Sequence, residues 1–178
     1  MGQLVTLHDR QFKPYISQQQ IAEAVKRIAE QIELDYKDEL PFFLVVLNGA
    51  FMFATDLLRS FNRKCELAFI KAASYSGVKS SGQVNLLIGL AEDVKDKRVL
   101  IVEDIVETGS TVEKLVRELH TRGVKDVKVA SLLLKTGIYI GEQPINYSGL
   151  HIGNEFVVGY GLDYNGLGRN LKEIYVLE

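Results

Sequence analysis

The chain has 178 residues, of which 47% are hydrophobic and 25% are charged, and its formal net charge is −2. This length suits one domain with a substantial core, and the composition excludes a disordered chain. No basic excess recruits nucleic acid and no apolar run is long enough to cross a membrane, so we expect a single cytoplasmic domain over residues 1–178.

The predicted elements alternate between helices and apolar strands. Ser17 followed by Gln20 is a capping-box pattern, and apolar residues then recur at helical spacing as far as Ile32. Residues 41–47 form a continuous apolar run, typical of a strand that is buried on both faces. The other expected elements are helices at 50–61 and 111–123 and strands at 66–75, 84–90, 98–104, 126–134, 156–162 and 173–177.

Buried strands that alternate with helices predict an α/β fold, in which a parallel sheet carries helices on both faces. Ligands of such sheets bind beyond the carboxyl ends of the strands. Glu103 and Asp104 stand at the end of one predicted strand. An acidic pair at this place can simply belong to a solvated loop. The residues that follow indicate whether the pair belongs to a binding site.

Those residues predict a phosphate site. Ser110 followed by Glu113 is a second capping-box pattern, which predicts a helix that begins near Thr111. Loop 107–111 then places backbone N–H groups, a glycine and hydroxyls at a helix N-terminus, where phosphate binds. Two neighbouring carboxylates would repel phosphate unless they met ribose hydroxyls or Mg²⁺. The whole stretch therefore suits a phosphorylated sugar with a metal ion, and it contains no Walker A pattern.

The same stretch, VLIVEDIVETGST (99–111), resembles the signature of type I phosphoribosyltransferases, which bind phosphoribosyl pyrophosphate (PRPP). Segments 45–58, 74–83, 127–135 and 154–171 are similar, in order, to the hypoxanthine-guanine branch. The resemblance implies the type I phosphoribosyltransferase fold with a small hood subdomain. It also implies purine salvage, in which PRPP and hypoxanthine or guanine give IMP or GMP and pyrophosphate, with Mg²⁺ as cofactor, in a homodimer or homotetramer.

The resemblance assigns a role to individual residues. The residues that would hold the ribose and 5-phosphate of PRPP are Glu103, Asp104, Thr108, Gly109, Ser110 and Thr111. Those implied at the pyrophosphate are Asn48, Gly49 and Arg169, and those in a flap that closes over the reaction are Ser74 and Tyr75. Those implied at the purine are Lys135 at the 6-oxygen, Phe156 stacked on the ring, Val157 at its edge, and Glu107 as acceptor of the N7 proton. Those implied for Mg²⁺ are Asp163, Glu103 and Asp104.

Two residues depart from the family pattern. Glu107 stands where the family has an aspartate, and the additional methylene moves the carboxylate by about one bond length. Asn48 stands where the family has lysine or arginine, so the pyrophosphate loop lacks that charge. The effect of both residues on catalysis stays open.

Other functions stay open as well. A transferase for another base is one alternative, and xanthine is the foremost candidate. A regulatory RNA-binding protein with the same fold is another, although the dispersed Lys and Arg residues and the negative net charge disfavour it. Taken singly, four of the assigned residues have plainer interpretations as core, strand-end, turn or surface residues: Phe156, Lys135, Asp163 and Arg169.

Overall fold

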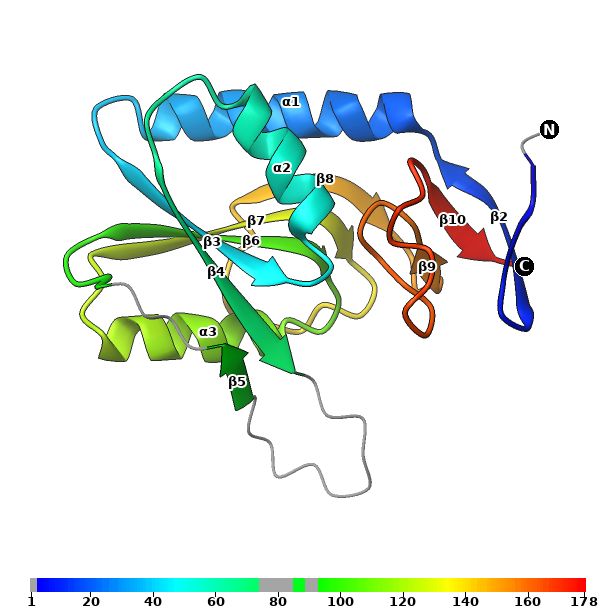
Figure 1. Cartoon of the computed structure of the whole chain (residues 1–178). Coiled ribbons are helices and arrows are strands. Elements are labelled where there is room, and N and C mark those ends of the chain that lie inside the picture. The colour runs from blue at the N-terminus through cyan, green and yellow to red at the C-terminus, as the bar shows by residue number, and fades with distance from the viewer. Residues whose placement is uncertain (1–2, 74–84, 89–92) are drawn as a thin grey trace.

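A six-stranded sheet forms the centre of the computed structural model, which describes residues 3–73, 85–88 and 93–178 (Figure 1). Its strands, in the order β5-β4-β3-β6-β7-β8, all pair in parallel except β5, which is antiparallel to β4. The strands are β3 (Pro41–Leu47), β4 (Glu66–Ala73), β5 (Asn85–Ile88), β6 (Arg98–Val106), β7 (Asp126–Lys135) and β8 (Tyr147–Ile152).

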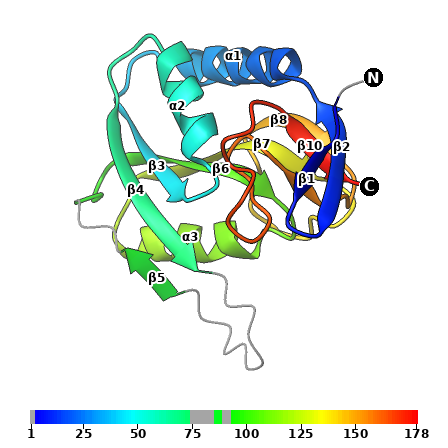
Figure 2. The same ribbon diagram turned by 45° about the vertical axis from the view of Figure 1, so that its right-hand side comes forward.

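Helices cover both faces of this sheet (Figure 2). Helices α1 (Gln18–Asp35) and α2 (Phe51–Ser60) lie on one face, and α3 (Ser110–Thr121) lies on the other. Phe43 and Val45 of β3 belong to the core cluster under α1 and α2, whereas Leu44 and Val46 belong to the cluster under α3. Successive strand residues thus serve opposite faces, which explains the continuous apolar run and confirms the predicted α/β class.

A second, four-stranded antiparallel sheet joins the two ends of the chain. Its strands, in the order β1-β2-β10-β9, are β1 (Val5–Leu7), β2 (Arg10–Ile16), β10 (Ile174–Leu177) and β9 (Val157–Val158). This sheet is the expected hood subdomain. Its two N-terminal strands, like β8 of the main sheet, are elements that the sequence patterns did not predict.

Several predicted boundaries change in the structure. The predicted strand at 156–162 is wrong beyond Val158, because Gly159, Tyr160 and Gly161 have φ values of 98°, 49° and 102° and turn the chain. The predicted strands at 66–75 and 84–90 are confirmed over β4 and β5, and their remaining residues lie outside the described ranges.

The capping box of Ser17 and Gln20 is confirmed at the start of α1. In the described ranges, no helix has the length and apolar character that a membrane span requires.

Candidate active site

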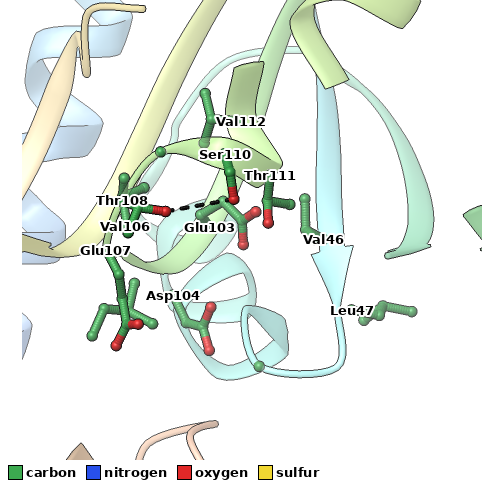
Figure 3. Close-up of a pocket in the computed structure, with 13 residues that line it drawn as sticks. Val46, Leu47, Glu103, Asp104, Val106, Glu107, Thr108, Ser110, Thr111 and Val112 are labelled. Atoms are coloured by element: carbon green, nitrogen blue, oxygen red, sulfur yellow. Dashed lines mark hydrogen bonds between the residues drawn. The ribbon is translucent and has the colours of Figure 1, made fainter. Parts of the chain in front are cut away.

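A cavity of about 350 Å³ opens beyond the carboxyl end of β6 (Figure 3). It is lined by Val46, Leu47, Gly49 and residues 103–112. All six residues implied for the ribose and 5-phosphate of PRPP are therefore brought together in one cavity. Glu103 and Asp104, as successive strand residues, extend in different directions from β6 into this space.

The N-terminus of α3 forms one side of this cavity. The helix begins at Ser110, one residue before the predicted start, and its N-cap is Gly109 with a φ of 90°. The predicted capping box is wrong: among the residues that the structure describes, no side chain caps the helix, and Glu113 accepts a hydrogen bond of 3.0 Å from the backbone N–H of Glu142 instead. The first-turn N–H groups therefore have no side-chain acceptor, and with the hydroxyls of Thr108 and Ser110 they can receive an anion. Loop 107–111 and the first turn of α3 are called the phosphate cradle below.

The two acids of β6 are held in an environment that opposes their ionisation. Glu103 is 7% exposed, and its burial, followed by the nearby charge of Asp104, raises its pKa well above the usual value. Burial also raises the pKa of Asp104 to about 6, against the opposing effects of backbone hydrogen bonds and Arg169. Among the described residues, neither carboxylate has an ion-pair partner. Hydroxyl donors or a cation beside them would stabilise the ionised forms of both carboxylates.

The backbone of Gly49 lies directly against Asp104. A Cβ atom on Gly49 would lie 1.7 Å from Asp104 Oδ2, so any larger residue here would displace the Asp104 carboxylate. On its other side, a Cβ on Gly161 would lie 2.0 Å from the carbonyl oxygen of Gly49. The loop after β3 is thus packed between Asp104 of β6 and the turn that follows β9. Asn48 beside it is exposed and lines neither this cavity nor the next one.

A second cavity of about 280 Å³ adjoins the first and shares Gly49, Asp104, Ile105 and Glu107 with it. Its other lining residues are Lys135, Phe156, Val157, Leu162, Asp163 and Arg169. The residues implied for the purine, together with Asp163 and Arg169, therefore surround one space between the ends of β6 and β7 and the hood. The sequence predicted all of these residues except Ile105 and Leu162, whose apolar character carried no distinguishing signal.

Lys135 and Glu107 form an ion pair inside the second cavity. Lys135 Nζ lies 2.5 Å from Glu107 Oε1. Lys135 is 5% exposed, whereas about half of the Glu107 side chain is accessible. A buried ammonium is costly without a partner, and Glu107 supplies one in the absence of a ligand.

Asp163 and Arg169 also form an ion pair, at 2.6 Å between Oδ1 and Nη2. Arg169 donates a second hydrogen bond of 2.6 Å to the carbonyl of Gly161, and the backbone N–H of Gly166 donates to Asp163 Oδ2 at 2.7 Å. Within the described ranges, no three His, Cys, Asp or Glu side chains converge as a metal cage. Mg²⁺ typically takes one or two carboxylates and completes its shell with water and substrate phosphates, so Asp104 and Asp163 fit a metal that binds together with substrate.

Phe156 is supported by an aromatic cluster of the hood that the sequence patterns missed. Its ring centroid lies 6.3 Å from that of Phe12 in β2 and 5.9 Å from that of Tyr164. Tyr164 in turn donates a hydrogen bond of 2.9 Å to Asp9. Phe156 remains 47% exposed, so one side of its ring is free for a ligand. The plainer interpretation of Phe156 as a core residue is therefore wrong.

Comparison with known proteins identifies the family of the chain. The model of the phosphoribosyl transferase domain matches residues 14–165. A hypoxanthine-guanine phosphoribosyltransferase of Streptococcus pneumoniae is 37% identical over 93% of both chains. A hypoxanthine-guanine-xanthine phosphoribosyltransferase of Tritrichomonas foetus is 34% identical over 91% of this chain and 89% of its own. The crystal structure of a hypoxanthine-guanine phosphoribosyltransferase from Bacillus anthracis is similar with a TM-score of 0.87 and 34% identity, over 93% of this chain and 96% of that one.

Proposed function

The chain belongs to the phosphoribosyltransferase family, and we propose that it transfers the phosphoribosyl group of PRPP to hypoxanthine or guanine in purine salvage. One observation carries this proposal: a cavity with a phosphate cradle adjoins a cavity with a buried lysine and an exposed aromatic ring. The shared wall between them, at Asp104 and Glu107, is where the sugar and the base would meet. The products are IMP or GMP and pyrophosphate.

PRPP binds first to the cradle in this proposal. Its 5-phosphate accepts hydrogen bonds from the first-turn N–H groups of α3 and from the hydroxyls of Thr108, Ser110 and Thr111. The ribose hydroxyls donate to Glu103 and Asp104, which have no other charged partner among the described residues. Binding thus satisfies two carboxylates whose burial is unfavourable in the free protein.

The purine occupies the second cavity with its ring on Phe156 and its edge at the Val157 backbone. Lys135 donates a hydrogen bond to the 6-oxygen of the purine. Glu107 accepts the proton of N7, the ring nitrogen on the same edge of the base. The base therefore has to separate the ion pair of Lys135 and Glu107 when it binds. Its 6-oxygen then contacts Lys135, and its N7–H contacts Glu107. An aspartate, one methylene shorter, would reach less far toward Lys135.

In the reaction, N9 of the purine forms a bond to the anomeric carbon of the ribose while the bond from that carbon to the pyrophosphate oxygen breaks. Positive charge develops at the anomeric carbon as the breaking bond lengthens, and the N7 proton passes to Glu107. Glu103 and Asp104 fix the ribose and stabilise this charge. Arg169, released from Asp163, donates to the departing pyrophosphate beside the Asn48–Gly49 loop. Asp163 and Asp104, which line the same cavity, would hold Mg²⁺, and the bound metal would neutralise charge on the pyrophosphate. Ser74 and Tyr75, the proposed flap, lie outside the described residues.

Xanthine is a second candidate base, because the Tritrichomonas foetus relative carries xanthine in its name. Xanthine presents the same 6-oxygen to Lys135, so the ion pair alone does not exclude it. The regulatory RNA-binding function has no such support, because the named relatives are transferases.

Self-association as a homodimer or homotetramer is also part of this proposal. Leu67 and Phe69 of β4 are 41% and 46% exposed, and as residues two apart in a strand they share one face. Because contiguous exposed apolar side chains mark interaction surfaces, this face of β4 is the surface that we propose for self-association. Light scattering of the purified protein gives the assembly state.

The function is tested by incubating the protein with PRPP, Mg²⁺ and hypoxanthine, guanine, xanthine or adenine. Nucleotide formation is followed by chromatography and pyrophosphate release by a coupled assay. We expect IMP or GMP to form with an equal amount of pyrophosphate. If none of the four bases yields a nucleotide, the proposed reaction is wrong.

A further inference from the structure

The loop between β7 and β8, residues 136–146, packs against the phosphate cradle through Tyr139. A Cβ atom on Gly109 would lie 2.6 Å from Tyr139 Cε2 and 3.3 Å from Cδ2. The ring edge thus occupies the space beside Gly109 where a side chain would otherwise be. Tyr139 itself is partly buried and packs against the core cluster under α3. It lines neither of the two cavities of the site.

Two further contacts connect the same loop to both sides of the cradle. The backbone N–H of Ile140 donates to the carbonyl of Thr108 at 3.4 Å, just before Gly109. The backbone N–H of Glu142 donates to the Glu113 carboxylate at 3.0 Å, in the first turn of α3. The loop therefore contacts the residues before, at and after the start of the helix.

The loop is also anchored at its own ends. The Tyr139 hydroxyl donates to the carbonyl of Gln143, which closes the loop on itself. The backbone N–H of Tyr139 donates to the carbonyl of Lys135 at 3.1 Å, so the ring is positioned from the end of β7. Because β7 pairs with β6 along its length, the support for Tyr139 comes from the same sheet that carries Glu103 and Asp104.

Gly109 needs such support more than another residue would. Its φ of 90° is accessible to glycine but strained for other residues, and glycine is also the residue with the greatest backbone freedom. The adjacent N–H groups bind phosphate only when they point at it, and displacement of a binding group by about 1 Å can be costly. Without a ring beside Gly109, the peptide units of the cradle gain room to turn away.

We propose that Tyr139 is a positioning residue for the 5-phosphate: its ring holds Gly109 so that the N-terminus of α3 is aimed at the phosphate. This inference rests on the proposed function, since it presumes that the cradle binds the 5-phosphate of PRPP and IMP. It assigns to Tyr139 no contact with substrate. Its effect is therefore confined to ligands that carry the phosphate.

The experiment compares IMP with inosine, which differ only in the 5-phosphate. Dissociation constants for both ligands are measured by NMR titration on the wild type, Tyr139→Ala and Tyr139→Phe. We expect Tyr139→Ala to weaken IMP binding by about tenfold or more, comparable to the loss of one charge-assisted hydrogen bond, and to leave inosine binding within about twofold. Tyr139→Phe keeps the ring against Gly109 and should retain most of the preference for IMP.

Ile140→Ala is the matched control, because the Ile140 side chain is 83% exposed and only its backbone contacts Thr108. It should bind both ligands as the wild type does. If Tyr139→Ala retains the preference for IMP, or loses IMP and inosine equally, the positioning role is wrong. If Tyr139→Ala does not fold, Tyr139→Leu, which keeps an apolar side chain without the ring edge, provides the same comparison. A wild type that binds no IMP would instead contradict the proposed function itself.

Discussion

Lys135 Nζ and Glu107 Oε1 lie 2.5 Å apart in the wall of the second cavity of the site. The lysine is almost entirely buried and the carboxylate is half exposed, so Glu107 compensates the charge of a lysine with little access to solvent. Both side chains are the ones that the purine edge would need. The two groups proposed to recognise the base therefore contact each other in the ligand-free protein, and a purine would have to offer a better partner to each.

Replacement of Glu107 tests its role as acceptor of the N7 proton. Glu107→Gln should lower kcat by roughly 10²–10⁴, the usual effect of losing a general base. Glu107→Asp should retain or raise the activity, because aspartate is the family residue at this position. Single-turnover kinetics measure the chemical step directly. A Gln variant that turns over like the wild type would leave Glu107 only as the partner of Lys135.

Base selection should depend on Lys135. Its ammonium has donors and no acceptor, so it pairs with the 6-oxygen of hypoxanthine or guanine and opposes the 6-amino group of adenine. Sites built around such a contact reject the wrong partner by roughly 10⁴–10⁵. Lys135→Met should therefore reduce kcat/KM for both 6-oxopurines much more than for adenine. Equal use of adenine and hypoxanthine by the wild type would show that Lys135 is not the selector.

The phosphate cradle predicts a loss of PRPP affinity in two variants. Gly109→Val places a side chain against the Tyr139 ring at a φ of 90°, and Thr111→Ala removes a hydroxyl donor. The Thr111 change should cost about 1 kcal/mol of binding free energy, and the Gly109 change should cost more. Gly137→Val is the matched control, because a Cβ on Gly137 meets no atom within 4 Å. Calorimetry that finds unchanged PRPP affinity in both cradle variants contradicts the assignment.

The acids of β6 predict how stability depends on pH in the metal-free, ligand-free protein. Asp104 has a pKa of about 6 in the folded state, and in an unfolded chain aspartate titrates at about 3.9. Because the pKa of Asp104 is higher in the folded state, the folded protein keeps this proton up to a higher pH than the unfolded chain does. The resulting stabilisation is present below pH 3.9 or so and is lost as pH rises through about 6.

Asp104→Asn should remove this loss of stability at higher pH, because asparagine does not ionise. At pH 7 we expect the variant to be more stable than the wild type by roughly 1–3 kcal/mol, and to depend less on pH between about 4 and 7. The same variant should bind PRPP more weakly, since it loses a ribose acceptor. Chemical denaturation at several pH values measures the first effect and calorimetry the second. A variant less stable than the wild type at pH 7 would show that Asp104 is not destabilising.

The predictable parts of the molecule were those whose patterns are local. The apolar run of β3 and the strand that carries Glu103 and Asp104 are visible in a few consecutive residues, so both are predicted, although the second strand, β6, continues past the predicted end at residue 104 to Val106. The predicted capping box of Ser110 and Glu113 is wrong because the Glu113 carboxylate accepts a hydrogen bond from the backbone N–H of Glu142, on a loop far along the chain. The strand after Phe156 failed because apolar letters do not reveal left-handed turn residues such as Tyr160. Tyr139 had no sequence signal, because its importance lies in the space beside Gly109.

The pairing of β2 with β10 makes the surroundings of Phe156 depend on two segments that are far apart in the sequence. β2 precedes every strand of the main sheet and β10 follows all of them, and β2 carries Phe12, whose ring centroid lies 6.3 Å from that of Phe156. Contacts between segments so far apart close a long loop, which costs chain entropy. We therefore expect the second sheet to form late in folding, and the contact between Phe12 and Phe156 to form with it.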